Sequence, residues 1–176
     1  GENVNLTEIY TGSRDAGNVT GAVTIVQDGA DLSGITIHRG AKNAAGTVGK
    51  NVFAYKSGKV EPIVGYDEVQ VYVDGAFRSL SAAMTKLSLK PSVTGFGYKA
   101  EFTADDAIKE MLVSQGYSIW LDGYGAINRT VSDFRNSLTL RLQNSEIENY
   151  GAAKVNAKVY VELSNGLIVE TEVVGY

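Results

Sequence analysis

Few residues of this chain could carry out catalysis. The 176 residues include one histidine, His38, and no cysteine. Cysteine nucleophiles and Cys/His zinc sites are therefore excluded, and a Ser-His-Asp triad would have to use His38. The sequence also has no G-x-S-x-G turn and no glycine-rich phosphate loop. We therefore predict a chain that is not an enzyme, with no catalytic residues, no cofactor and no metal site.

Acidic residues offer the remaining chemistry, since a hydrolase that uses only carboxylates needs two of them facing each other. Asp105 and Asp106 are adjacent, and neighbours on a helix point about 100° apart, so they do not face each other across a substrate. Asp15, Asp28 and Asp31 lie in glycine-rich stretches and could bind Ca²⁺. Because no D-x-D-x-D-G loop is present, we interpret these three as turn residues.

His38 and the overall charge argue against several kinds of partner. No acidic or metal-binding residue is visible beside His38, so we interpret it as a surface histidine at the end of a strand. A net charge of −4 and a pI near 5.0 argue against nucleic acid, which needs clustered basic charge. No apolar run approaches the ~20 residues that span a bilayer, so we expect no membrane insertion.

The elements that must position these residues differ between two parts of the chain. Residues 1–65 hold 11 of the 20 glycines, placed between short β-branched runs at residues 19–26, 35–38 and 51–55. Runs this short, bounded by turn residues, predict strands. Their close spacing suits either a β-meander or the coils of a β-solenoid. We assign residues 1–80 to this glycine-rich β region.

The second part has clearer signals. Residues 68–73 alternate polar and apolar side chains before the turn dipeptide Asp74-Gly75, and residues 79–84 suit one helical turn. A short helix is expected to begin with Thr103 as its N-cap and to end at Gly116. Within it, an apolar stripe at helical spacing is formed by Ile108, Met111 and Leu112.

The strongest local signal is a hairpin at the end of the sequence. Residues 154–163 alternate over ten positions, residues 164–166 read Ser-Asn-Gly, and residues 167–174 return. Asn-Gly suits a type I′ turn, which needs two positive φ angles. Alternating strands with one polar face imply antiparallel sheets, and two packed sheets make a sandwich. The predicted fold is therefore mainly β: an antiparallel β-sandwich with one short helix at residues 81–176, preceded by the glycine-rich β region.

The second part also resembles a bacterial module. The motifs are Y-K-A-x-F at residues 98–102 after residues 87–91, G-Y-S-I-W-L at 116–121, and Y-V-E-L-S-N-G at 160–166. In this order they resemble the C-terminal β-sandwich modules of secreted and cell-surface Firmicutes proteins, over roughly residues 84–176. The resemblance implies a non-catalytic unit outside the cell or on the bacterial surface, with neighbouring domains in a longer chain. Because the chain starts at glycine rather than methionine, we also expect that a targeting segment has been removed.

Three aromatic residues are candidates for ligand binding. By strand alternation, Trp120, Tyr72 and Tyr160 point away from the residues expected in the core. Such rings would form a stacking platform for the apolar faces of sugar rings. The other interpretation is that Trp120, the only tryptophan, packs beneath the helix or between the two regions, and this is the one we favour.

The leading functional hypothesis is a non-catalytic extracellular module of a bacterial surface or secreted protein, acting as stalk, spacer or adhesion surface. Its expected partners are cell-surface glycans, a host or neighbouring protein, or neighbouring domains of the same chain. The alternative is a carbohydrate-binding module that uses the three aromatic residues. A carboxylate-only hydrolase is the third possibility, since no other catalytic chemistry remains.

Overall fold

The computed structural model describes residues 6–14, 17–42, 46–59, 61–86, 95–123, 125–143 and 154–175. These residues form a mainly β fold with a single short helix. The strands of the first half are β1 (Glu8–Tyr10), β2 (Val19–Asp28), β3 (Thr36–His38), β4 (Val48–Ser57), β5 (Ile63–Val64), β6 (Glu68–Val73) and β7 (Ala76–Lys86). The second half contains β8 (Gly95–Ala104), α1 (Asp106–Glu110), β9 (Leu112–Leu121), β10 (Ile127–Val131), β11 (Ser137–Gln143), β12 (Val155–Leu163), β13 (Ile168–Glu170) and β14 (Val174–Gly175).

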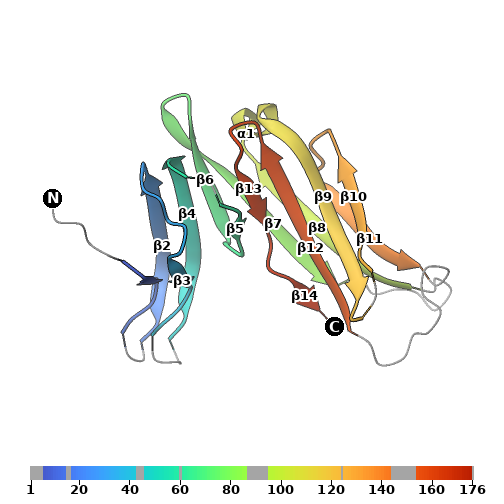
Figure 1. The fold of residues 1–176 in the computed structure, drawn as a ribbon, viewed down its shortest axis with the longest axis horizontal. Helices are drawn as coiled ribbons and strands as arrows, with labels where there is room; N and C mark the ends of the chain where they lie inside the picture. The colour runs from blue at the N-terminus through green and yellow to red at the C-terminus, as the bar shows by residue number, and fades with distance from the viewer. Residues whose placement is uncertain are drawn as a thin grey trace.

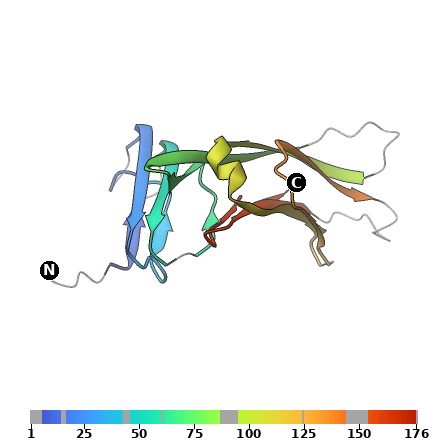
Figure 2. The ribbon, with the colours of Figure 1, turned by 90° about the horizontal axis from the view of Figure 1, so that it is seen from above.

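Two six-stranded sheets dominate the architecture. One has the order β11-β8-β7-β6-β4-β2, and the other has the order β10-β9-β12-β13-β5, with β14 also paired to β12. Figure 1 shows the first sheet reaching from the blue strands near the N-terminus into the sandwich, and Figure 2 shows the two sheets as separate layers there. A small third sheet contains only β1 and β3.

The first part of the chain is built from stacked parallel coils. β2 pairs in parallel with β4, β4 pairs in parallel with β6, and β1 pairs in parallel with β3. Within most of these pairs each residue lies beside the residue 28 positions later, as Glu8 beside Thr36 and Ile25 beside Phe53. A meander would have paired these neighbours antiparallel. Of the two predicted arrangements, the structure therefore shows the solenoid coils.

The two regions expected from the sequence share one sheet. The boundary predicted between residues 80 and 81 falls inside β7, which pairs with β6 on one side and β8 on the other. Residues 79–84, expected as a helical turn, belong to this strand, so that prediction is wrong. The antiparallel sandwich itself agrees with the sequence, and β5 and β6 from the first region extend its two sheets.

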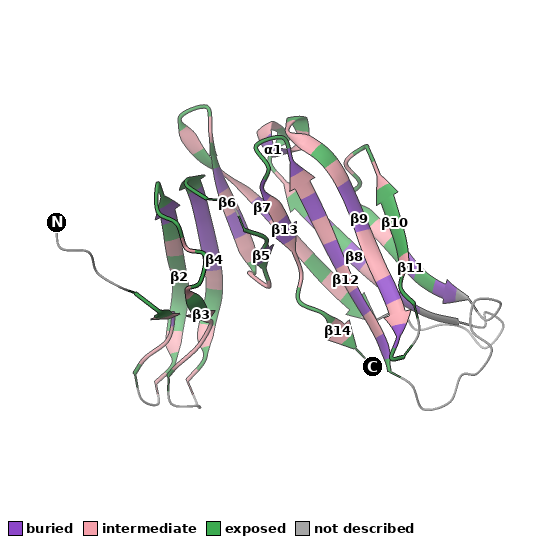
Figure 3. Ribbon diagram, viewed as in Figure 1, coloured by how far each residue is buried: buried purple, intermediate pink, exposed green. Residues whose placement is uncertain are grey.

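The core lies between the sheets and follows strict alternation. In β12 every second residue from Val155 to Leu163 is buried, and Figure 3 shows this as alternating purple and pink along the strand. Facing it from the other sheet, Tyr98 is 1% exposed and Leu140 is fully buried. Each such side chain contributes about 1.5–3 kcal/mol by leaving water, so the alternating strands supply most of the stability.

The helix is shorter than the sequence suggested. α1 spans five residues with Asp105 as its N-cap, and Asp105 makes no capping hydrogen bond through its side chain. Thr103 lies in β8 and Gly116 lies in the middle of β9, so the predicted helix start and end are both wrong. Ile108 alone is buried from the helix proper, which packs against β6 and β7.

Two turns illustrate how glycine shapes the hairpins. Asp74 and Gly75 both have positive φ, 49° and 81°, as a type I′ turn between β6 and β7 requires. At the turn between β12 and β13, Gly166 has φ 84°, whereas Asp74 is the only non-glycine residue with positive φ in the described part of the chain. The hairpin at residues 154–174 is present, but its turn has one left-handed residue and is not the type I′ turn that we predicted.

A polar cluster holds β4, β6 and β7 together where the coils meet the sandwich. The Glu68 carboxylate forms an ion pair with Lys50 and accepts hydrogen bonds from Ser79 Oγ at 2.6 Å and Gln70 Nε2 at 2.7 Å. These hydrogen bonds, that of Lys50 first, lower the pKa of Glu68 from 4.5 to about 2. The charged form of Glu68 thus stabilises the fold.

We expect this cluster to make stability depend on acid pH. Glu68 has a lowered pKa in the folded chain, so its contribution is complete above about pH 4.5 and is lost as the pH falls toward about 2. Because Lys50 is nearly half exposed, we expect a loss of only about 1–2 kcal/mol. Urea unfolding at pH 6 and pH 2.5 measures this loss of unfolding free energy. Glu68→Gln should be less stable than the parent at pH 6, and its unfolding free energy should decrease less between pH 6 and pH 2.5. Equal decreases in both proteins would contradict the stabilising role of the Glu68 carboxylate.

Candidate functional site

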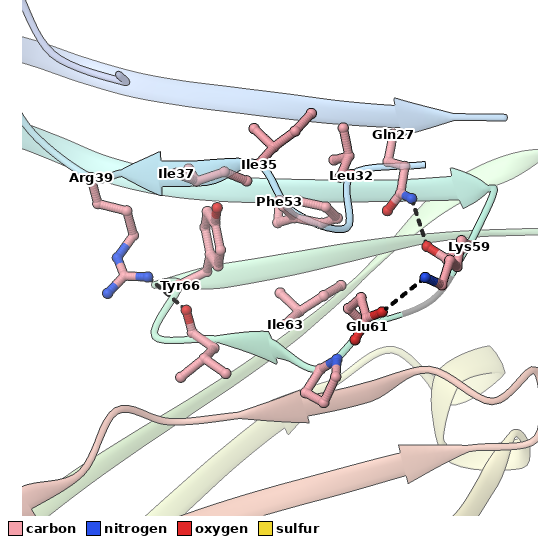
Figure 4. A pocket seen from close by; sticks show the side chains of 12 residues that line it. Gln27, Leu32, Ile35, Ile37, Arg39, Phe53, Lys59, Glu61, Ile63 and Tyr66 are labelled. Carbon is pink, nitrogen blue, oxygen red and sulfur yellow. Dashed lines mark hydrogen bonds and ion pairs between the residues drawn. The ribbon is translucent and has the colours of Figure 1, made fainter. Parts of the chain in front are cut away.

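A cavity of about 230 Å³ lies among the coils, between β3 and β5 (Figure 4). It exists because the last coil is short: β6 lies beside β4 at an offset of 16 residues, as Phe53 beside Val69. β5 consequently pairs with β13 of the sandwich, while β3 pairs with β1. Its apolar lining includes Leu32, Ile35, Ile37, Phe53, Ile63 and Val64.

Polar groups mark the two ends of this cavity. At one end Arg39 donates a hydrogen bond to the carbonyl oxygen of Val64 at 2.6 Å and forms an ion pair with Glu172. At the other end the ammonium of Lys59 lies 3.4 Å from Glu61. Figure 4 shows these groups at opposite sides of the apolar middle. The side chains that line the cavity therefore all come from the coils, between residues 27 and 66, and Glu172 after β13 is connected to the cavity only through Arg39.

Tyr66 is the most unusual residue of the cavity. Its ring contacts Phe53 edge-on at 5.2 Å between centroids, and the Arg39 guanidinium lies 5.3 Å from its ring centre. The hydroxyl is buried and has no hydrogen-bond partner among the described residues. Burial raises the pKa of Tyr66, and the Arg39 charge acts in the opposite direction. A buried hydroxyl without a hydrogen-bond partner lowers the stability of the fold by about 1–3 kcal/mol. A ligand or a water molecule that hydrogen-bonds to the Tyr66 hydroxyl would recover this free energy.

The arrangement fits binding better than catalysis. Apolar walls and aromatic rings remove a molecule from water, and one unpaired hydroxyl fixes its orientation. The volume suits a small molecule with one hydrogen-bonding group. Both donors of the Gln27 amide nitrogen, at the wall, are already used, since Nε2 donates to the Ala30 and Lys59 carbonyl oxygens at 2.8 Å each.

Two of the three predicted aromatic residues share a surface. Trp120 on β9 and Tyr160 on β12 lie on the outer face of the same sheet, both partly buried. Trp120 pairs with Asn156, and Tyr160 pairs with Gly116, four positions away along β9. The helix packs on β6 and β7, so the expectation that Trp120 lies beneath it is wrong.

The third aromatic residue lies elsewhere. Tyr72 is on β6 in the opposite sheet, is 40% exposed and contacts Phe77 edge-on at 5.2 Å between ring centroids. Lys56 lies 5.5 Å from the centre of its ring. The structure therefore does not bring Tyr72 together with Trp120 and Tyr160, and the three do not form one platform.

His38 has neighbours that the sequence did not reveal. Its ring stacks on Tyr10 at 4.3 Å between centroids, nearly parallel, and its Nε2 lies 3.6 Å from a carboxylate oxygen of Glu8. The interpretation as a residue at the end of a strand is correct, but the absence of an acidic neighbour is not. The 28-residue offset creates this contact, because β1 and β3 lie side by side.

The acidic candidates are used locally. Asp28 accepts hydrogen bonds from Lys56 at 2.7 Å and Ser57 at 2.9 Å, and these lower its pKa; Asp31 accepts one from the Ser33 backbone. Asp106 pairs with Lys109 within α1.

Asp15 lies outside the described residues, as do residues 87–91 of the resemblance motif. Within the described ranges, no three acidic, histidine or cysteine side chains gather in a way that could hold a metal ion.

The cavity residues could have been found from one signal in the sequence. Residues 28 positions apart match in type at several places, including Ile9 with Ile37, Gly12 with Gly40 and Ile35 with Ile63. An internal repeat of this kind predicts stacked coils. The strand pattern alone does not use this repeat, and so it does not show which strands of the coils lie side by side.

The comparisons with known proteins assign no family. No protein-family model matches the chain, and no curated protein matches it significantly. No helix within the described part of the chain has the length and apolar character needed to cross a membrane.

Proposed function

We propose that this chain is a non-catalytic extracellular module of a bacterial surface or secreted protein, acting as a rigid spacer or stalk segment. The observation that carries the proposal is that one continuous sheet, with the order β11-β8-β7-β6-β4-β2, runs from the coils into the sandwich. A sheet shared by two regions resists bending at their junction, whereas a flexible linker does not. Figure 1 shows the resulting elongated body, with the N-terminal coils and the sandwich side by side along its long axis.

Side-chain ion pairs and hydrogen bonds also connect the coils and the sandwich at their junction. Glu68 links β4, β6 and β7 through Lys50 and Ser79, and Arg39 on the coil side is paired with Glu172 from the end of the sandwich. The Arg39–Glu172 pair joins the two sides of the predicted boundary, and the Glu68 contacts fix β4 and β6 to β7, the strand that crosses this boundary. They support a spacer that transmits orientation between its neighbours.

A distance measurement tests the rigidity that this proposal requires. The chain has no cysteine, so spin labels can be attached at engineered pairs, Ala30→Cys with Thr139→Cys across the junction and Val113→Cys with Thr139→Cys within the sandwich. All three positions are exposed. We expect equally narrow distance distributions for both pairs in double electron–electron resonance, with labelled protein diluted in unlabelled protein. A much broader distribution across the junction would contradict the spacer.

Localisation needs a separate test. Antibodies raised against this chain should label intact source cells, or precipitate the protein from culture medium, without permeabilisation. Labelling that requires permeabilised cells would overturn the extracellular assignment while leaving the rigidity result untouched.

A carbohydrate-binding role is the second candidate, because Trp120 and Tyr160 share one outer face. Soluble glucans or mannans should then protect Trp120 fluorescence from iodide quenching, and Trp120→Ala should abolish retention on the polysaccharide. Tyr72→Ala, on the other sheet, is the matched control and should bind normally. Unchanged quenching across a polysaccharide panel would remove this candidate.

A further inference from the structure

The cavity between β3 and β5 has the size of a small-molecule site. Its volume is about 230 Å³. An apolar protein cavity of about 150 Å³ is large enough to hold benzene, so this one admits a molecule of about nine non-hydrogen atoms. Glu61, Pro62 and Val64 on its rim are exposed, whereas Phe53 and Ile63 in its wall are buried. The cavity therefore opens at the surface, where a molecule of this size can enter.

The walls of the cavity favour a ligand that is largely apolar. Ile35, just before β3, and Ile37 within β3 both line the cavity and are only half-buried. Isoleucine is among the residues most often fully buried in proteins, so both side chains would gain from further cover. A molecule in the cavity would cover them and lie against the ring of Phe53 (Figure 4). Removal of this apolar surface from water supplies the main part of the binding free energy.

The charged residues of the lining favour a neutral ligand. Three lining side chains carry a charge, namely Arg39, Lys59 and Glu61. Arg39 is paired with Glu172, and Lys59 lies 3.4 Å from Glu61, so each of these charges already has a counter-charge. A carboxylate or an ammonium group in the cavity would lose its hydration without gaining an unpaired partner, and this makes a charged ligand unfavourable.

The Tyr66 hydroxyl sets the hydrogen-bonding group of the ligand. This hydroxyl is buried and has no partner among the described residues. Burial raises the pKa of Tyr66, so the hydroxyl keeps its proton and can donate a hydrogen bond. The Arg39 guanidinium, 5.3 Å from the centre of the Tyr66 ring, favours an electronegative oxygen nearby. A carbonyl oxygen is a neutral acceptor that meets both conditions.

We propose that this cavity binds a small neutral carbonyl compound, of the size of an aromatic ketone. Its oxygen accepts a hydrogen bond from Tyr66, and its apolar body lies against Ile37 and Phe53. Figure 4 shows Tyr66 at the Arg39 end of the cavity and Phe53 along its middle, as this arrangement requires. The binding site goes beyond the spacer function and does not depend on it, because all the lining residues lie in the coils.

A titration with acetophenone tests the proposal. The methyl signals of isoleucine-labelled protein report where this ketone binds. We expect saturable shifts at Ile35, Ile37 and Ile63 with a Kd of about 0.1–1 mM, as good ligands of this size reach. Ile119, fully buried in the sandwich, is the internal control and should not shift. Benzoate, which is matched in size but charged, should bind at least about tenfold more weakly.

Tyr66→Phe tests the hydrogen bond, because it keeps the ring and removes only the hydroxyl. The Kd for acetophenone should rise about fivefold. The Kd for ethylbenzene, which is of similar size and has no oxygen, should not change. The variant should unfold at a temperature no lower than that of the parent, because it loses a buried hydroxyl that has no partner.

A variant that fills the cavity tests the location of the site. Ile37→Phe should abolish the shifts at Ile35 and Ile63. Val26→Phe is the matched control, since Val26 is exposed and does not line the cavity, and it should bind normally. The proposal would be overturned by any of four results: no saturable shift of the cavity isoleucines, tighter binding of benzoate than of acetophenone, a Tyr66→Phe variant that weakens both probes equally or is less stable than the parent, or undiminished binding by Ile37→Phe.

Discussion

Replacing Tyr98 by alanine is expected to lower the free energy of unfolding by about 3–5 kcal/mol, as loss of a large buried aromatic side chain does. Tyr98 is 1% exposed and lies between the two sheets. Its hydroxyl donates toward the carbonyl oxygens of Val155 at 3.0 Å and Val174 at 3.3 Å. One side chain on β8 therefore contacts both β12 and the terminal strand β14 of the facing sheet.

Urea unfolding measures this effect, with Trp120 fluorescence and far-ultraviolet circular dichroism as independent probes. Tyr98→Phe is the matched control, since it keeps the ring and removes only the hydroxyl. It should cost about 1–2 kcal/mol because buried carbonyl groups lose a donor. If the alanine variant unfolds at the same urea concentration as the parent, Tyr98 does not join the sheets as described.

The sandwich could be predicted because alternation is a local signal. In β12 the polar and apolar residues alternate from Val155 to Leu163, and burial follows the same order. The bounds of the helix were harder to predict than the sandwich. Thr103 has the side chain of a typical N-cap, but it lies in β8, where it pairs with Ser81. Strand pairing over the whole of β8 outweighs a cap that would contribute about 1 kcal/mol.

The candidate site depends on contacts that are not local. Tyr66 meets Phe53 and Arg39 because the coils stack, and the cavity remains because the last coil is shorter than the one before. A strand pattern shows which face of each strand is apolar, but it does not show which strand lies beside it. The 28-residue repeat carries that information for the pairs β1/β3 and β2/β4, but not for β4 and β6, which pair at an offset of 16 residues.

The three aromatic candidates also show that a strand pattern predicts the face on which a residue lies but not which strand lies beside it. Alternation correctly put Trp120 and Tyr160 on an outer face, because each follows the pleat of its own strand. Whether Tyr72 joins them depends on which sheet takes up β6. The shared sheet places Tyr72 beside Phe77 on the opposite layer, so strand faces were predictable and the platform was not.

Gly116→Ala is expected to cost about 2–3 kcal/mol, since β9 has no space for a side chain at this position. A Cβ atom there would lie 2.3 Å from the carbonyl oxygen of Arg129 on β10 and 2.7 Å from the ring of Tyr160 on β12. The Tyr160 ring covers the glycine, and its hydroxyl lies 2.8 Å from Thr130 Oγ1. Gly116 thus lets three strands and one aromatic ring approach closely on the outer face.

The ring and the backbone contributions can be separated with a double mutant. Tyr160→Ala removes the ring, so the cost of Gly116→Ala should be smaller in that background, while the contact with Arg129 keeps it above zero. Ser118→Ala, two residues away on the same face, loses only an exposed hydrogen bond to Asn128 and should change stability by less than about 0.5 kcal/mol. In the Gly116→Ala single mutant, the backbone amides of β10 should exchange hydrogen faster than in the parent, because the clash with Arg129 separates β10 from β9. Equal stability and exchange in Gly116→Ala and the parent would mean that β10 and Tyr160 do not pack on β9 at Gly116, and the outer face that carries Trp120 and Tyr160 would have to be redrawn.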